Sequence, residues 1–369
     1  MHLFGHSLAI LILASSLVSQ TQAVSPTNSG PLVPAKIPVK KPAEILQFVS
    51  ARNGVDVPSA KPWHVELTYD QFGADGHNVH RGTIEEYYFG PKKYRLSYSS
   101  DELRQTDIAT ESGLYRSGEQ HWPGLVELQI LDEVLRPFYR LDVHVQCWSH
   151  MDSCTKADKV NWRLGAVKLN CIIIDRTDTI ISDSALPKYC FENDTVPLRY
   201  TRGQGLDETT YNNFTLFQDR YVAHDAVVMR AGKPFLKIHI QQLENLTQVD
   251  HGLFTPAPAS SGPLAGRITL SSDVLMDRYL LHQEYPVFSH HTPGKVKVRF
   301  VIGKDGQVLE AEALDGQEEM RKASLDAIRK CQFRPYLILG EPVEVESQAV
   351  FEFNTGSGMR YVGPWPPKQ

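Results

Sequence analysis

The sequence predicts an α+β protein in two folded parts: a long antiparallel β-sheet region with few helices, and a smaller region of strand, strand, helix and strand. Three observations lead to this prediction. The 369 residues suffice for about two domains of ordinary size. Apolar residues alternate in many short segments between residues 63 and 253. Clear helical spacing followed by a return to alternation occurs near the C-terminus.

The composition excludes several classes of protein. Hydrophobic residues make up 41% and charged residues 22%, which is ordinary for a globular chain. The net charge is −5, so nucleic-acid binding is not expected, because phosphate affinity needs a concentrated positive surface. Apart from a borderline stretch at the N-terminus, no apolar run reaches the ~18 residues of a membrane span. A multi-span membrane protein is therefore excluded.

The first residues have the pattern of an export signal. Leu8–Leu13 is almost wholly aliphatic, and Thr21 and Ala23 fit the small-residue pattern of a cleavage site. The alternative is an uncleaved anchor over Leu3–Val18, although this span is short for a bilayer. We expect residues 1–23 to be a signal peptide that is removed on export of the chain. An uncleaved segment would instead anchor the chain to a membrane.

Export places the cysteines in an oxidising compartment, where disulfides are favoured. The chain has five of them: Cys147, Cys154, Cys171, Cys190 and Cys331. The first four allow three pairings, and Cys147–Cys154 with Cys171–Cys190 closes the shortest loops. We expect that arrangement, with Cys331 as a buried free thiol that continues the apolar stripe of a helix.

A metal site is the competing interpretation of the first two cysteines. His144 and His150 lie beside Cys147 and Cys154 at intervals that resemble metal-ligand spacing. Zinc needs thiolates, whereas an oxidising compartment favours the disulfide, so no metal or cofactor is expected. Cys147 with His150 could also be imagined as a nucleophile and its base. Since no catalytic motif occurs elsewhere, the chain is not expected to be an enzyme.

The chain divides at changes of composition. Residues 24–42 contain five prolines and are predicted to form an extended tether. The β-rich domain is expected over residues 43–255, opening with a helical pattern at Ala43–Asn53. A Pro/Ser/Gly-rich linker is expected at residues 256–265. The C-terminal domain would then cover residues 266–355, with a disordered tail at residues 356–369.

Strands of the β-rich domain are predicted from alternation and from turn signals such as Gly90-Pro91. The candidates are His64–Phe72, Thr83–Phe89, Lys93–Tyr98, Val143–Cys147, Ala166–Asp175, Thr209–Phe217, Tyr221–Arg230 and Phe235–Asn245. Their number and spacing are typical of an antiparallel sheet.

The C-terminal domain has a clearer pattern, ββαβ. Its predicted elements are Lys295–Ile302, Val308–Leu314, Gln317–Cys331 and Val343–Phe353. Asp305-Gly306 is a hairpin turn signal between the first two. In the second strand, Leu309, Ala311 and Ala313 are expected on the same side. An antiparallel sheet with one helix on its apolar face follows.

Charges predict the order of these strands. The first strand carries Lys297 and Arg299 on one face, and acidic residues occur on both other strands. They are Glu310, Glu312, Glu344, Glu346 and Glu352. A central first strand sets opposite charges beside each other, worth ~0.2–1 kcal/mol per good pair. The last strand is then expected at an edge.

Five motifs in this order resemble the TonB C-terminal domain family. They are Tyr285-Pro286, Gly294–Ile302, Asp305-Gly306 with Val308, Leu325–Pro335 and Gly340–Val343. The resemblance covers roughly residues 266–355. It implies a periplasmic module that binds a short extended segment of an outer-membrane receptor. In energised transport, such a module transmits work from an inner-membrane motor.

Three departures from that family concern the motor. His2 and His6 precede the apolar part of the N-terminal segment, whereas the family places a His to engage the motor. The family's long Pro-rich rod is replaced by a folded domain. Cys331 stands where the family usually has Trp. Contact with inner-membrane motor proteins is therefore expected only if the N-terminus is uncleaved.

Residues 43–255 resemble, in architecture alone, a LolA-like half-barrel, a curved antiparallel sheet with an apolar concave side. This resemblance implies a lipid or lipoprotein ligand. The two resemblances thus imply two alternative functions. The first is a TonB-like protein that binds a receptor segment, with energy transduction as a further role. The alternative is a LolA-like carrier that uses the TonB-like domain for docking.

The last strand is the predicted partner-binding site. An edge strand offers unpaired N–H and C=O groups to which an extended segment can add. The residues assigned to binding are Val343, Val345, Ser347, Gln348, Ala349, Val350 and Phe351. The resemblance places Tyr285 and Pro286 beside the docked segment. The alternative is that the tail, Asn354–Gln369, caps this edge.

Overall fold

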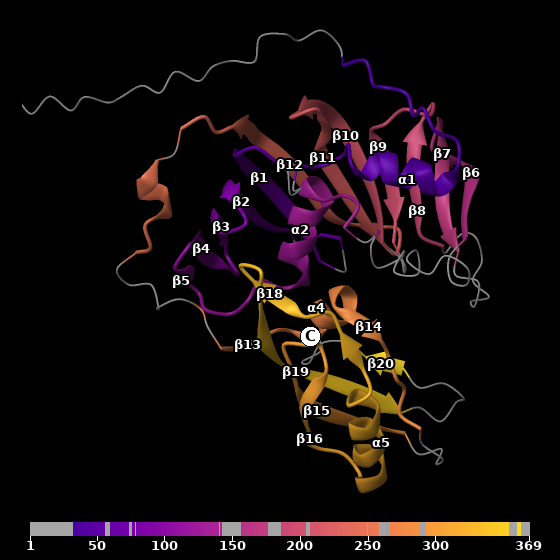
Figure 1. The fold of residues 1–369 in the computed structure, drawn as a ribbon. Helices are drawn as coiled ribbons and strands as arrows, with labels where there is room; N and C mark the ends of the chain where they lie inside the picture. Colours follow the sequence, from indigo (N-terminus) through magenta and orange to yellow (C-terminus); the bar gives the residue numbers. More distant parts are fainter. Residues whose placement is uncertain are drawn as a thin grey trace, which may run out of the picture. The chain divides into compact units, whose positions relative to one another are not determined.

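The computed structural model describes residues 32–55, 60–73, 76–77, 79–139, 141, 156–175, 186–203, 207–248, 250–257, 264, 266–287, 293–353 and 360–362. Pro34–Gln369 forms one compact unit. It contains a large sheet, with strands from Trp63 to Asn245, and a small one, with strands from Arg267 to Val362 (Figure 1). The α+β prediction is confirmed.

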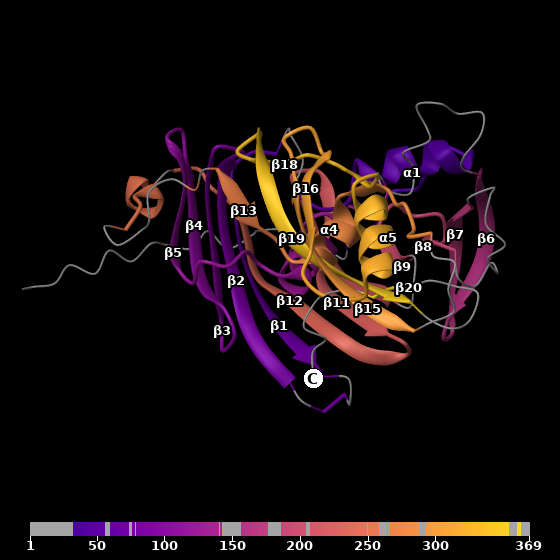
Figure 2. The same cartoon turned by 90° about the horizontal axis from the view of Figure 1, so that it is seen from below.

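The large sheet has twelve antiparallel strands in the described residues. They are β1 (Trp63–Phe72), β2 (Val79–Gly90), β3 (Lys93–Ser100), β4 (Arg104–Thr110), β5 (Gly113–Gly118), β6 (Lys156–Leu164), β7 (Val167–Asp175), β8 (Lys188–Glu192), β9 (Leu198–Arg202), β10 (Asp207–Phe217), β11 (Arg220–Arg230) and β12 (Lys233–Asn245). Their order is β5-β4-β3-β2-β1-β12-β11-β10-β9-β8-β7-β6, so the first and last strands pair at the centre. The sheet is curved (Figures 1 and 2).

Two helices pack on the inner face of this sheet. Helix α1 (Pro42–Ser50) begins at a proline, whose fixed φ suits a first helical turn. It buries Ile45, Leu46 and Val49, which share one face by helical spacing. Helix α2 (Leu125–Leu135) is buried along most of its length. Both helices contribute to one apolar core with the strands.

Most of the predicted strands are present, with a few exceptions. Val143–Cys147 lies outside the described residues. Helix α2 and strands β4, β5, β6, β8 and β9 were not predicted. Part of the predicted tether is also fixed to the sheet region, because Ile37 N–H donates to Asp194 O and Val196 N–H donates to Ala35 O, both at 2.9 Å.

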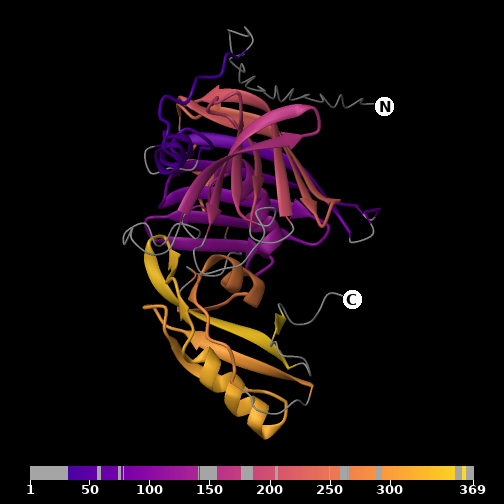
Figure 3. The same cartoon turned by 90° about the vertical axis from the view of Figure 1, so that its right-hand side faces the viewer.

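The small sheet has the order β13-β19-β15-β16, with β18 and β20 also paired to β19. Its strands are β13 (Arg267–Thr269), β15 (Gly294–Ile302), β16 (Val308–Ala313), β18 (Tyr336–Ile338), β19 (Glu341–Phe353) and β20 (Arg360–Val362). Helix α5 (Glu318–Ile328) lies along one face (Figures 2 and 3). The remaining elements are η2 (His251–Phe254), α4 (Ser272–Arg278), and the paired strands β14 (Leu280–His282) and β17 (Gln332–Phe333).

The core of the small sheet follows the predicted alternation. Val296, Val298 and Phe300 of β15 are fully buried, beneath Met320 and Ile328 of α5. The central position predicted for this strand is confirmed, since β15 lies between β19 and β16.

The prediction for Leu309 is wrong. Its side chain is 55% exposed, whereas Ala313 is buried, so the two residues do not share one side. The reason is an irregularity in the pairing: Val301 faces Glu310 but Ile302 faces Val308, so Leu309 is an extra residue. Because an extra residue interrupts the alternation of the strand, Leu309 does not lie on the same side of the sheet as Ala313.

Gly306 in the β15–β16 turn offers a stability test. Its φ is 84°, and an added Cβ would overlap the carbonyl oxygen of Phe333. The N–H of Phe333 donates a hydrogen bond to Gly306 O, which holds the two backbones close together. We expect Gly306→Ala to lower the free energy of unfolding by about 1 kcal/mol for the positive φ and by about 1–3 kcal/mol more for the overlap. Urea denaturation measures the difference.

Gly340 is the matched control. Its φ is 87°, but an added Cβ would meet no atom within 4 Å. Gly340→Ala should therefore cost only the backbone contribution. Equal losses in the two variants would contradict the overlap at Gly306.

Candidate functional site

Strand β19 holds its side chains on two different faces. Val345, Ser347 and Ala349 are buried on the side of α5. Gln348 is exposed on the other side, and Glu346 and Glu352 are half-buried there. The alternation predicted for this strand is thus present.

The backbone N–H and C=O groups of β19 point alternately toward β15 and away from it, within the plane of the sheet. Glu346 O accepts a hydrogen bond from Leu270 N–H at 3.0 Å, so Glu346 points away from β15. On β15, Lys297 O accepts from Leu314 N–H at 2.8 Å, so the backbone groups of Lys297 point away from β19. The backbone groups of the next residue, Val298, therefore point toward β19, where they face those of the opposite residue, Ala349. The outward-facing backbone positions of β19 are therefore 344, 346, 348, 350 and 352.

The expectation that β19 is an edge strand is wrong. Strand β13 runs parallel to it, with Ile268 opposite Val345. Strand β20 runs antiparallel to it, with Tyr361 opposite Phe351. The alternative, that the tail caps the edge, is therefore correct for the segment Val350–Glu352, and the tail residues Arg360–Val362 form a strand where disorder was predicted.

A short stretch remains between the two added strands. In the part of the chain that the structure describes, no strand pairs with Gln348 on its outer side. Ser347 Oγ donates to Leu270 O at 2.7 Å, which holds the end of β13 beside this stretch. A groove of about 770 Å³ borders Ser347, Gln348 and Leu270. The gap is thus accessible from this groove.

Ion pairs cross the solvent face in the predicted arrangement. Arg299 pairs with Glu312 at 2.7 Å and approaches Glu346 at 3.9 Å. Lys295 pairs with Glu352 at 3.1 Å. Each exposed pair contributes about 0–1 kcal/mol, so their main effect is to favour the correct strand order.

Arg267 adds a further ion-paired position, on β13. It bridges Glu310 at 3.0 Å and Glu344 at 3.1 Å, and these carboxylates raise its pKa. Neither this pairing nor β13 itself was predicted. The segment Arg-Ile-Thr is too short to show a period, although it lies at the start of the predicted domain.

Tyr285 and Pro286 lie in the loop after β14. Tyr285 is 54% exposed, and its hydroxyl donates to Gln283 Oε1 at 3.3 Å. Strand β14 pairs with β17 and not with β19. The other predicted binding residues, Val343 to Phe351, all lie on one strand, β19.

The disulfide prediction is confirmed for Cys171 and Cys190. They lie opposite each other on β7 and β8, with Cα atoms 3.9 Å apart, and are bonded. Cys147 and Cys154 lie outside the described residues, as do His144 and His150. Among the residues that are described, no three His, Cys, Asp or Glu side chains are grouped so that they could hold a metal ion.

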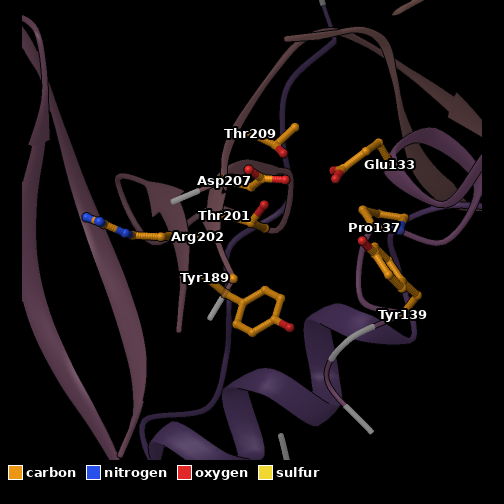
Figure 4. Close-up of a pocket in the computed structure, with 9 residues that line it drawn as sticks. Glu133, Pro137, Tyr139, Tyr189, Thr201, Arg202, Asp207 and Thr209 are labelled. Carbon is orange, nitrogen blue, oxygen red and sulfur yellow. The ribbon is translucent and has the colours of Figure 1, made fainter. Parts of the chain in front are cut away.

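A small polar pocket of about 20 Å³ lies at the inner face of the large sheet (Figure 4). The carboxylate of Glu133 from α2 accepts a hydrogen bond from the buried Tyr211 hydroxyl at 2.6 Å. Burial and this carboxylate raise the pKa of Tyr211 well above its usual range. The pocket is near the size of one water molecule and is too small for an acyl chain.

The C-terminal part matches a known family. Residues 289–355 match the family model of the Gram-negative bacterial TonB protein C-terminal region, which confirms the resemblance stated from the motifs. This match indicates a protein of the bacterial cell envelope. No curated protein matches the sequence. In the described residues, no helix is long and apolar enough to span a membrane.

Solved structures match the remaining part weakly. A LolA superfamily protein from Nitrosomonas europaea is 10% identical, covering 59% of this chain and 98% of its own, with a TM-score of 0.36. A putative outer membrane lipoprotein-sorting protein domain from Vibrio parahaemolyticus is 12% identical, covering 57% and 95%, with a TM-score of 0.32. A DUF1329 family protein from Desulfovibrio piger is 9% identical, covering 58% and 98%, with a TM-score of 0.33. They are of the expected LolA-like kind, but likeness at this level supports no functional conclusion.

Cys331 provides a test of the packing at the C-terminal end of α5. The side chain is buried beneath α5, and burial raises the pKa of its thiol. A smaller fraction is thiolate at any given pH than in an exposed cysteine, so alkylation should be slow. We expect labelling at pH 8 to be at least about 100-fold slower in the native than in the unfolded chain. Peptide-resolved mass spectrometry follows this site separately, with Cys171 and Cys190 labelled only after reduction as the control. Equal native and unfolded rates at Cys331 would contradict its placement.

Proposed function

We propose that the chain is a periplasmic envelope protein that binds an extended segment of an outer-membrane receptor beside β19. The observation that carries this proposal is the position of Gln348. Its backbone groups face outward, no described strand pairs with them, and a groove borders the residue. Strand addition would satisfy these groups, at about 0.5–1.5 kcal/mol net for each hydrogen bond.

The side chains around this position favour a backbone-dominated mode of binding. Glu346 and Glu352 are already paired with Arg299 and Lys295, so the strand does not present a row of free charges. Affinity would come mainly from main-chain hydrogen bonds. Tyr285 and Val287 are exposed and would supply selectivity if the partner extends to their loop.

Energy transduction is a further role, and it depends on the N-terminus. Coupling to inner-membrane motor proteins requires an uncleaved anchor, whereas cleavage after Ala23 leaves a periplasmic binding protein. The proposal assigns no catalytic step, cofactor or nucleic-acid contact to the chain.

Site-specific cross-linking in intact cells tests the proposal. A photo-reactive side chain at Gln348 should cross-link to outer-membrane receptors, within a segment that peptide mapping shows to be short and extended. The reason is that this position borders the groove beside β19. Replacing Lys322, exposed on α5, provides the matched control, because its side chain lies on the helix and not on the outer side of β19.

Two outcomes would contradict receptor binding at this site. One is an absence of receptor adducts at Gln348 in cells that express the receptors. The other is an equal adduct yield at Gln348 and Lys322, which would indicate non-specific contact.

A carrier of lipid or lipoprotein is the second candidate function. It is favoured by the apolar inner face of the large sheet, which in the described residues is covered by only two helices, of 9 and 11 residues. The pocket beside Glu133 measures about 20 Å³, so cargo that entered there would need α2 to move away from the sheet. The Glu133–Tyr211 hydrogen bond is one contact that holds α2 in place.

Removing that hydrogen bond tests the carrier function. Hydrogen bonds to charged groups are worth about 1.5–3 kcal/mol, so Tyr211→Phe should speed uptake of a fluorescent fatty acid about tenfold or more. Tyr115→Phe is the control, because Tyr115 lies on β5 and its hydroxyl hydrogen-bonds to exposed Ser112 in the β4–β5 turn, away from α2. Stopped-flow fluorescence measures uptake by the full chain. No uptake by any of the three proteins would speak against a carrier.

A further inference from the structure

The tail strand β20 uses the backbone of β19 at the place where a partner would add. Val362 lies opposite Val350, and Arg360 lies opposite Glu352. Both β19 positions are outward-facing by the alternation established at Glu346. The chain therefore already contains one short extended segment bound to this surface.

From this arrangement we infer that β20 is an internal occupant of the partner-binding surface, and that an extended partner binds by displacing it. The inference rests on the proposed function. A partner that pairs with Gln348 and continues along β19 would next pair with the outward backbone groups of Val350. In the structure, β20 is already paired with Val350. Without displacement, the partner would be limited to the stretch between β13 and β20.

Side-chain contacts hold strand β13 on β19. Strand β13 is followed by Leu270, which is buried, and its own Ile268 is buried. Arg267 is paired to two carboxylates, and Ser347 Oγ donates to Leu270 O. Strand β20 pairs with the segment of β19 that comes next after Gln348. Since β13 is held by the contacts above, an extended partner that continues along β19 past Gln348 would displace β20.

The surface also specifies the kind of segment that fits. Outward-facing groups at Gln348, Val350 and Glu352 require about five consecutive extended residues. The partner residues that bond to these positions must have an N–H, so proline is excluded there. Val350 is 5% exposed in the presence of β20, so an apolar residue opposite it would keep it covered. Glu352 is paired with Lys295, which suits a polar neighbour.

The first experiment uses the chain's own tail as the probe. A full chain is compared with a variant that ends at Asn354, and both are titrated with a fluorescent peptide of residues 355–369. We expect the shortened chain to bind the peptide at least about tenfold more tightly in an anisotropy titration, because its surface is vacant. Equal binding to the two chains would overturn the internal-occupant inference.

Two peptide variants test the register without altering the protein. In the observed pairing, the N–H groups of Arg360 and Val362 face β19, whereas that of Tyr361 faces away. Val362→Pro in the peptide should abolish binding, and Tyr361→Pro should weaken it much less. An unchanged affinity of the Val362→Pro peptide would overturn the inference.

The second experiment separates this inference from the proposed function. Receptor cross-linking at Gln348 should rise about tenfold when the chain ends at Asn354. Adducts that form equally in both chains would leave receptor binding intact and overturn displacement. An absence of adducts in both chains would contradict the proposed function, and the displacement inference with it.

Discussion

Each residue of β19 directs its backbone N–H and C=O either toward β15 or away from it, and this alternation determines which of its backbone groups can pair with a further strand. The inward groups hold the strand in the sheet, through pairs such as Val298 with Ala349. The outward groups are obligatory hydrogen-bonding groups that need other partners. Strands β13 and β20 satisfy them at either end, and Gln348 lies between these strands. If a partner adds to β19 as we propose, it would thus compete with β13 and β20 for these outward backbone groups.

Side-chain packing keeps that row in place. Apolar residues of β15 and β19 fill one face beneath α5, so a shift in register by one residue would turn the buried set to solvent. Ion pairs from Arg299 and Lys295 favour the same register on the opposite face. The outward groups therefore stay at constant positions, as a strand-adding partner requires.

The small sheet was predictable from the sequence because its main elements each bury a single face. Alternation in β15 and β19 and helical spacing in α5 identify them without tertiary information. Strands β13 and β20 have three residues each, which is too few to show a period. The outer side of β19 was therefore misassigned as an edge, even though the residues on the strand were placed correctly.

In the large sheet, some elements could not be predicted from sequence patterns because they bury polar residues. Helix α2 buries Gln129, Asp132 and Glu133 as well as apolar residues, so it lacks the one-sided stripe by which helices are recognised. Strands β4 and β5 bury Asp107 and Arg116, paired at 2.6 Å, where alternation would require apolar residues. Buried polar pairs of this kind depend on contacts between strands, and they are not visible within either strand alone.

The attachment of the N-terminal arm defines a mechanical path through the protein. Hydrogen bonds fix Ala35 and Ile37 to the β8–β9 connection, and Tyr221 Oη accepts from Ala35 N–H at 2.7 Å. A pulling force on the arm would be received at these bonds, close in sequence to β8, which the disulfide fastens to β7. The load would thus enter the sheet at its covalently reinforced end. A load applied between the arm and the small sheet would leave the large sheet through β12, which precedes the small sheet in the chain, so the load would cross the strands between β8 and β12.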